Sequence, residues 1–179
     1  MKIIETRIPD IKIIQLNAFG DLRGHFFENF HEQRYQDMLG ITDHFVQDNF
    51  SRSEKNVLRG LHIQTQYQQG KLVTVLSGSV FDVAVDLRVG SPTYQQWVGV
   101  ELSSDNKKQL WIPKGFAHGF YVLSKSADFY YKCTDYYYPK FEKTILWNDP
   151  ILNIQWPINA SPIISDKDKA GVFLGSLAL

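Results

Sequence analysis

The sequence has a single cysteine, Cys133, among 179 residues, so one chain cannot form an internal disulfide. This scarcity excludes the small secreted domains that disulfides stabilise, and it fits the reducing cytoplasm. No apolar run approaches the roughly 20 residues that a membrane helix needs. Residues 1–16 alternate apolar and polar positions and carry charges throughout, unlike the core of a signal peptide. We therefore expect a cytoplasmic protein without a membrane partner.

An excess of charge of either sign is also missing, because 19 Lys and Arg balance 19 Asp and Glu. Nucleic acids and anionic membranes attract proteins that carry a surplus of positive charge, so neither is an expected partner. The balance still permits a local basic pocket for a small phosphorylated ligand.

Aromatic residues, in contrast, are abundant, with 12 Phe, 9 Tyr and 4 Trp. Large rings suit a β-sandwich or barrel, where they fill the space between two sheets. The length of 179 residues suffices for one domain with a real core and is short for two. We expect a single domain over residues 1–179.

Short runs rich in β-branched and aromatic residues occupy most of the region 44–148, and Gly, Pro, Asn, Asp or Ser bound each run. Residues 2–16 predict one or two strands interrupted by Pro9. The segment LSGSVFDVAVDLR, residues 76–88, predicts a hairpin that turns at its Ser-Gly-Ser. Many short strands at regular spacing predict an all-β domain of two closed sheets.

Helices are few in this pattern. Residues 31–40 predict one, with Tyr35, Met38 and Leu39 on one side and a glycine at its end. The C-terminal tail predicts an irregular wrap around the sheets, with a short helix after Ser165.

His62 interrupts a strand-like run, VLRGLHIQ at residues 57–64. In a regular strand, alternation places His62 and Gly60 on one face and Arg59 on the other. A glycine inside a strand often marks the close approach of a ligand or of another backbone. From these residues alone, a functional role for His62 and a structural role remain equally open.

A second segment, IPKGFAHGF at residues 112–120, contains Pro-x-Gly-x-x-His and places its histidine at His118. This spacing is half of the pattern of cupins, which are small jelly-roll barrels. The other half in metal-binding cupins contains His-x-His and a glutamate, whereas the matching stretch here holds His62 alone. A catalytic metal usually has three protein ligands. The pattern therefore favours a barrel without a metal over a metal-dependent one.

A barrel without a metal could use His62 as a general base, because imidazole titrates near neutral pH. Lys71 could stabilise an enolate beside that base, or it could be a solvated strand end. Tyr130 and Tyr131 are consecutive, so alternation turns one of them inward. A buried phenol there could act as an acid, or it could pack among other rings.

Two arginines are candidates for binding a phosphate. Arg23 and Arg59 could each hold one through the paired donors of the guanidinium group. Either could equally form an ion pair at the surface, and the sequence does not separate these alternatives.

Several long motifs in order identify the chain as similar to a known family. They are FGDLRGHFFE (19–28), FVQDNFSRSEKNVLRGLHIQ (45–64), GKLV (70–73), GSVFDVAVDLRVGSPTYQQWVGVELS (78–103), QLWIPKGFAHGF (109–120), YYKCTDYY (130–137) and ILWNDP (145–150). These motifs resemble those of the dTDP-4-dehydrorhamnose 3,5-epimerases, which are metal-free, cupin-like epimerases of sugar nucleotides. The resemblance implies a jelly-roll barrel with a few short helices, a homodimer, and neither a metal nor another cofactor.

The resemblance also implies catalytic roles. His62 matches the general base, and Asp168 in the tail matches the aspartate that pairs with it. Tyr131 matches the acid, while Lys71 and His118 match residues near the sugar carbonyl.

Further positions match residues that contact the nucleotide or the sugar. They are Arg23, Phe26, Glu28, Gln47, Asp48, Asn49, Arg59, Tyr137, Glu142 and Lys167. By the same resemblance, Tyr137 is expected to stack on thymine, and Arg23 and Phe26 are expected to reach the active site of a partner subunit.

The implied reaction converts dTDP-4-dehydro-6-deoxy-D-glucose to dTDP-4-dehydro-L-rhamnose. The C4 ketone of that sugar acidifies the hydrogens on C3 and C5, so a base can remove each proton and an acid on the opposite face can invert the carbon. Two alternatives stay open: a mono-epimerase of another dTDP-deoxysugar pathway, acting at C3 or C5 alone, and a sugar-nucleotide binding barrel without activity. The order of the inversions and the choice between thymine and uracil also stay open.

Overall fold

Two antiparallel sheets face each other in the computed structural model, which describes residues 1–177. The six-stranded sheet has the order β1 (Lys2–Glu5), β2 (Lys12–Gln15), β10 (Lys108–Ile112), β7 (Lys71–Ser77), β12 (Ser126–Cys133) and β5 (Gln47–Glu54). The five-stranded sheet has the order β13 (Glu142–Thr144), β6 (Leu58–Gln64), β11 (Phe116–Val122), β8 (Ser79–Asp86) and β9 (Trp97–Ser103). This arrangement confirms the predicted all-β, jelly-roll fold class.

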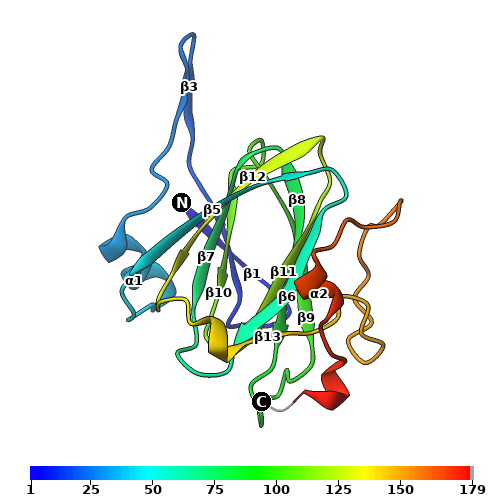
Figure 1. The fold of residues 1–179 in the computed structure, drawn as a ribbon. Helices are drawn as coiled ribbons and strands as arrows, with labels where there is room; N and C mark the ends of the chain where they lie inside the picture. The colour runs from blue at the N-terminus through cyan, green and yellow to red at the C-terminus, as the bar shows by residue number, and fades with distance from the viewer. Residues whose placement is uncertain (178–179) are drawn as a thin grey trace.

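The other elements lie outside these sheets (Figure 1). A hairpin of β3 (Phe19–Asp21) and β4 (Gly24–Phe26) projects from the body of the molecule. The helical elements are α1 (Glu32–Leu39), η1 (Pro139–Phe141), α2 (Asp166–Lys169) and η2 (Leu174–Ser176). Within residues 1–177, no helix combines the length and the apolar character that crossing a membrane requires.

The main core lies between the two sheets, where aromatic rings fill the space as predicted. Phe120 of the five-stranded sheet stacks on Phe129 of the six-stranded sheet, with ring centroids 4.1 Å apart. Val73 and Val75 from β7 and Val80 from β8 are buried in the same cluster. Phe120 and Phe129 also line a cavity between the sheets, so that cavity borders this core.

The predicted hairpin at residues 76–88 is wrong. The chain does turn at Gly78, but β7 and β8 belong to different sheets and do not pair. Gly78 has a φ of 76°, and a Cβ atom there would lie 2.1 Å from the carbonyl oxygen of Ser126, so the corner requires glycine. By changing sheets here, the chain lets Val75 and Val80 meet in one core from opposite sides. A turn signal alone does not distinguish a hairpin from a corner between two sheets.

Helix α1 and the two N-terminal strands confirm the predictions for this region, with one exception. His31 caps the helix, and Gly40 ends it in the left-handed conformation with a φ of 67°. Tyr35 is buried as expected, but Met38 is exposed. The stripe that contacts the sheet runs through Tyr35 and Leu39, four residues apart, and Met38 falls beside it.

The C-terminal tail wraps the outer face of the five-stranded sheet, as predicted, with α2 directly after Ser165 (Figure 1). Leu152, Ile154 and Leu174 are buried against this face. The buried carboxylate of Asp149 joins the two ends of the tail, because it accepts hydrogen bonds from the backbone N–H groups of Leu152 and Leu174 at 3.0 and 2.6 Å. The wrap therefore returns α2 to the side of β6.

Candidate active site

A cavity of about 330 Å³ opens between the two sheets. Its lining combines charged, polar and aromatic side chains from both sheets and from the tail. The lining residues are Gln47, Asn49, Phe50, Ser51, Arg59, His62, Gln69, Lys71, His118, Gly119, Phe120, Phe129, Tyr131, Tyr137, Glu142 and Lys167. Ten of these were predicted site residues, so the fold gathers most of the predicted set at one place.

An irregularity in β6 places both Arg59 and His62 at this cavity, although regular alternation predicts opposite faces for them. The register between β6 and β11 shifts beside Gly60, whose φ is 109°. A Cβ atom at Gly60 would lie 2.7 Å from the backbone of His118 and Gly119, so the two strands can approach here only through glycine. The strand is therefore not regular at this point, and the irregularity brings Arg59, which the resemblance predicts at the site, to the same cavity as His62.

His62 is hydrogen-bonded to Asp168 of α2, with Nε2 and Oδ1 2.5 Å apart. The second oxygen of Asp168 accepts the backbone N–H of Gly60 at 3.3 Å, and the hydroxyl of Ser165 accepts the backbone N–H of Asp168. Burial by itself would raise the pKa of Asp168, but the hydrogen bonds from His62 and Gly60 outweigh it and lower that pKa. An ionised carboxylate accepts from Nε2, which leaves Nδ1 of His62 as the nitrogen that can take a proton.

Tyr131 enters the cavity from β12, while its neighbour Tyr130 points to the outer face and donates to Asp48 at 2.8 Å. Burial, with the charge of Glu142, raises the pKa of Tyr131 to about 12. The phenol is therefore protonated at neutral pH and can give up a proton.

Lys71 lies beside Tyr131, with its Nζ atom 6.0 Å from the centre of the ring. Burial lowers the pKa of Lys71, and the carboxylates of Glu142 and Asp82 act against that lowering. The side chain of Lys71 makes no hydrogen bond within the described residues. Every fully buried side-chain nitrogen or oxygen there has a hydrogen-bond partner, so Nζ of Lys71 must be accessible from the cavity that Lys71 lines. Its amino group is accordingly directed at the cavity.

His118 is paired with His62 across β11 and β6, so the two imidazoles enter the cavity from neighbouring strands. Nε2 of His118 lies 2.9 Å from Oδ2 and 3.1 Å from Oδ1 of Asp82, which is fully buried on β8. Burial lowers the pKa of His118, and the charge and hydrogen bond of Asp82 offset that lowering only in part. His118 is therefore neutral at neutral pH.

The mouth of the cavity carries a polar cluster from three separate segments. Glu142 of β13 accepts a hydrogen bond from the Tyr137 hydroxyl at 2.9 Å and forms an ion pair with Lys167 of α2. Arg59 donates from Nε to the hydroxyl of Ser53 at 3.0 Å. Because Lys167 adjoins Asp168, α2 supplies both a cation at the mouth and the partner of His62.

Four predicted site residues lie away from the cavity of the same chain. Arg23 and Phe26 are on the projecting hairpin, where Arg23 pairs with Asp21. Glu28 pairs with Arg34. Asp48 points to the outer face of the six-stranded sheet, where it binds Lys132 and Tyr130.

Several functional positions were not assigned from the sequence. Ser51, Gln69 and Phe129 line the cavity, and Asp82 holds His118. The alternation of β5 was an available signal for Ser51, since Gln47, Asn49 and Ser51 share a face. Asp82 was visible as a carboxylate within an apolar strand, a pattern that usually requires a buried partner.

Fold and site together define the class of protein. An imidazole paired with a carboxylate, a protonated phenol and a lysine amino group lie at one cavity, and groups of these kinds can move a proton at a carbon beside a carbonyl. Among residues 1–177, no three His, Cys, Asp or Glu side chains gather closely enough to hold a metal ion. The molecule is a cupin-like barrel equipped for acid–base chemistry.

Residues 5–175 match the family model of dTDP-4-dehydrorhamnose 3,5-epimerase, and the chain belongs to that family. The dTDP-4-dehydrorhamnose 3,5-epimerase of Salmonella typhimurium is 53% identical, over 100% of this chain and 98% of that protein. A crystal structure of dTDP-6-deoxy-D-glucose-3,5-epimerase RmlC from Legionella pneumophila, in complex with dTDP-4-keto-L-rhamnose, is 60% identical and superposes with a TM-score of 0.98, covering 99% and 94% of the two chains. ChmJ, a 3'-monoepimerase from Streptomyces bikiniensis, is 28% identical with a TM-score of 0.89, over 96% and 87%.

Proposed function

We propose that this protein converts dTDP-4-dehydro-6-deoxy-D-glucose to dTDP-4-dehydro-L-rhamnose by inverting C3 and C5 through enolate intermediates. One observation carries the proposal. His62 of the five-stranded sheet, held by Asp168 of α2, and Tyr131 of the six-stranded sheet line the same cavity. The family membership and the likeness to a structure that holds dTDP-4-keto-L-rhamnose support it.

In the first step, His62 removes the proton from a carbon next to the ketone. Nδ1 accepts the proton, and Asp168 stabilises the resulting imidazolium through Nε2. The negative charge moves to the C4 oxygen, where the ammonium group of Lys71 stabilises it. A positioned acid or base typically contributes about 10²–10⁴-fold to the rate.

In the second step, Tyr131 returns a proton to the other face of the same carbon. His62 and Tyr131 come from facing sheets, so a sugar ring between them meets the base on one face and the acid on the other. The imidazolium and the phenolate that remain exchange their proton through water before the second carbon reacts. The ketone supplies the acidity of both hydrogens, so the scheme runs on protein groups alone.

The cations at the mouth are placed to bind the diphosphate of the substrate. Arg59 offers the free nitrogens of its guanidinium, and Lys167 can leave Glu142 for a phosphate oxygen. The exposed ring of Tyr137 beside them is available to stack on the base. A local basic patch of this kind binds an anionic ligand although the whole chain is neutral.

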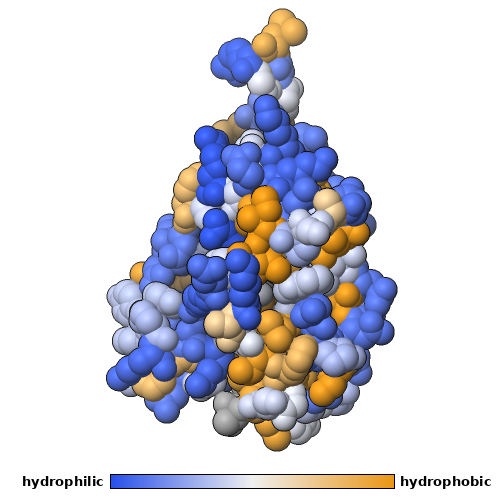
Figure 2. Space-filling model, turned by 45° about the vertical axis from the view of Figure 1, so that its right-hand side comes forward, coloured by the Kyte–Doolittle hydropathy of each residue, from blue (hydrophilic) through white to orange (hydrophobic). Residues whose placement is uncertain are grey.

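We also propose that the active unit is a homodimer. The projecting hairpin exposes Phe19, Leu22 and Phe26 to solvent in a single chain, and Figure 2 shows apolar surface at the tip of this projection. Exposed apolar groups on a projecting element are typical of an interface. Arg23 lies between them, so a hairpin inserted at a partner's cavity mouth would bring a further cation to the diphosphate.

A mono-epimerase is the second candidate, because ChmJ, a 3'-monoepimerase, shares this fold at a TM-score of 0.89. Such an enzyme needs the same base, acid and cation, and it differs only in how many carbons it inverts. The lower identity of 28% makes it the weaker alternative.

Solvent deuterium tests the proposal directly. Incubation of the protein with dTDP-4-dehydro-6-deoxy-D-glucose in D₂O is expected to give a product with deuterium at both C3 and C5, assigned by NMR. Label at one carbon alone would establish the mono-epimerase, and absence of label at both carbons would refute the proposal.

A further inference from the structure

The pair His118–Asp82 is a second imidazole–carboxylate pair in the cavity, and proton abstraction by His62 does not use it. Asp82 is fully buried, and His118 is its single side-chain partner among the described residues. A buried carboxylate without several donors is costly to desolvate. Its hydrogen bond to one ring nitrogen fixes the orientation and the tautomer of the partner imidazole.

The geometry fixes which nitrogen of His118 is available. A carboxylate accepts hydrogen bonds, so Nε2 of His118 carries the proton that Asp82 holds at 2.9 Å. Nδ1 makes no hydrogen bond to another residue of the described chain, and no buried polar side-chain atom there is unsatisfied. Nδ1 therefore opens into the cavity that His118 lines.

A neutral imidazole with its proton on Nε2 presents a lone pair at Nδ1, not a proton. It can accept a hydrogen bond from a hydroxyl group but cannot donate one to a carbonyl or an enolate oxygen. Lys71, with its ammonium group at the same cavity, is the donor for that oxygen. The two groups thus match two different functions of a 4-keto sugar: a ring hydroxyl and the ketone.

We propose that Asp82 is a positioning residue, which holds His118 in the tautomer that accepts a hydrogen bond from a ring hydroxyl next to the reacting ketone. This inference rests on the proposed function for the identity of the sugar. It moves His118 from the carbonyl, where the family resemblance placed it, to a hydroxyl of the substrate.

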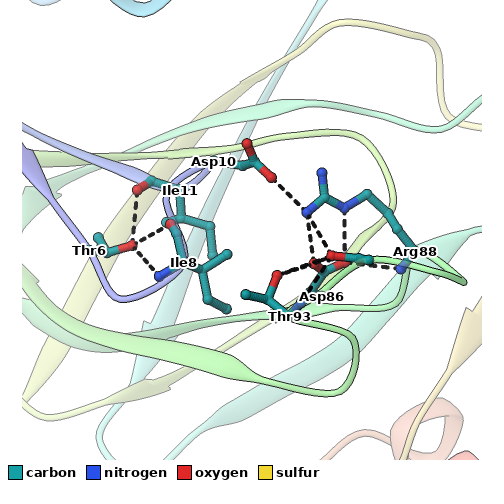
Figure 3. A network of polar contacts seen from close by, with 8 residues as sticks. Thr6, Ile8, Asp10, Ile11, Asp86, Arg88 and Thr93 are labelled. Carbon is teal, nitrogen blue, oxygen red and sulfur yellow. Dashed lines mark hydrogen bonds and ion pairs between the residues drawn. The ribbon is translucent and has the colours of Figure 1, made fainter.

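The same strand offers a matched control. Asp86 is also fully buried on β8, but its carboxylate binds Arg88 and Thr93 at the end of the strand, away from the cavity (Figure 3). Asp82→Asn and Asp86→Asn both remove a buried negative charge from β8. If the buried charge matters only for folding, both variants lose stability and neither loses kcat. If Asp82 positions His118, kcat falls in Asp82→Asn alone.

The expected result is a fall in kcat of roughly 10²-fold for Asp82→Asn, with deuterium exchange slowed at both carbons and binding of dTDP unchanged. Asp86→Asn should keep the wild-type kcat at a temperature where it is folded. Equal kcat values in the two variants would overturn the inference.

The tautomer can be read without any variant, from the ¹⁵N chemical shifts of histidine in the wild-type protein at pH 7. His118 is expected to show a protonated Nε2 and a bare Nδ1, and the Nδ1 signal should move upfield when dTDP-4-keto-L-rhamnose binds. A protonated Nδ1, in the free or the bound state, would overturn the inference even if Asp82→Asn fails to fold. Absence of turnover in the wild type would instead refute the proposed function. The ¹⁵N spectrum would still determine the tautomer of His118, because that measurement does not depend on turnover.

Discussion

Burial and hydrogen bonding together set the protonation states of single residues at this site. The phenol of Tyr131 keeps its proton because burial, first among its causes, raises its pKa to about 12. The carboxylate of Asp168 is buried as well, but its hydrogen bonds with His62 and Gly60 lower its pKa. Opposite shifts in two buried groups separate an acid that stays protonated from a carboxylate that stays charged.

Substitution of the two proton-transfer residues should separate the halves of the reaction. His62→Ala is expected to abolish deuterium exchange at C3 and C5, a loss of at least 10²–10⁴-fold. Tyr131→Phe is expected to retain exchange while inversion fails, because abstraction needs only the base. Normal inversion by Tyr131→Phe, followed by NMR of the product, would remove the phenol from the mechanism.

The single thiol should be inert in the folded protein. Cys133 is fully buried, and burial raises its pKa to about 11, although Lys71 acts in the opposite direction. The reactive thiolate is therefore scarce at pH 8. Iodoacetamide is expected to leave Cys133 unmodified in the native state and to alkylate it after denaturation, as mass spectrometry would report; fast alkylation of the native protein would contradict this.

At the scale of elements, two features bring residues to the site that regular strand alternation would not place there. Gly60 shifts the register of β6 so that Arg59 and His62 both face the cavity. The tail then carries Asp168 across the outside of the sheet, and α2 delivers it behind His62. The imidazole of His62 is thus oriented by a residue 106 positions away in the sequence.

Gly60→Ala should disturb β6 and the cavity together. The φ of 109° and the 2.7 Å approach to Gly119 leave no room for a methyl group, so the strand must shift. We expect a loss of about 1–3 kcal/mol in the free energy of unfolding, measured by denaturant titration, together with weaker dTDP binding as Arg59 moves. Gly90→Ala is the control, since Gly90 also has a positive φ but no atom within 4 Å of an added Cβ.

The loop after β8 should show an acid-dependent contribution to stability. Burial by itself would raise the pKa of Asp86, but hydrogen bonds from Arg88, Ser91 and Thr93 outweigh it and leave that pKa far below its ordinary value. Because the folded-state pKa lies below the unfolded one, this contribution is complete above about pH 4 and is lost as the pH falls through the folded pKa.

Asp86→Asn is therefore expected to lower the free energy of unfolding by about 1.5–3 kcal/mol at pH 7. The difference from the wild type should shrink as the pH falls below about 4. Denaturant titrations of both proteins at pH 7 and pH 3 measure it, and a difference that is independent of pH would contradict the assignment.

At the scale of the whole molecule, the projecting hairpin is the feature that one chain does not explain. It packs on little of its own body and carries apolar side chains into solvent (Figures 1 and 2). Three of the four predicted site residues that lie away from the cavity are on it or directly after it: Arg23, Phe26 and Glu28. A second copy that receives the hairpin accounts for both observations.

Leu22→Asp should weaken that association, because it puts a charge on the exposed tip of the hairpin. We expect the dimer dissociation constant to rise roughly tenfold or more in sedimentation velocity, with a lower kcat/KM for the sugar nucleotide. Val89→Asp is the control, since Val89 is an exposed apolar residue on a different loop. A wild-type protein that is monomeric and fully active would contradict the dimer.

The sequence by itself determined the fold class, the N-terminal strands, helix α1 and most of the cavity lining. Alternation, turn residues and long family motifs are read from short segments of sequence. Such signals predict strands and turns whichever strands later become neighbours. The family motifs also selected His62 and Tyr131, because alternation left the role of His62 open and did not choose between Tyr130 and Tyr131.

Only the tertiary structure decided that Gly78 is a corner between sheets, that Arg59 shares a face with His62, and that Asp82 holds His118. Each of these depends on which strands become neighbours, and strand neighbours here are set by the packing of two sheets around a common core. Alternation predicts the face on which a side chain lies only in a regular strand. It therefore fails at the register shift beside Gly60, which is part of the site.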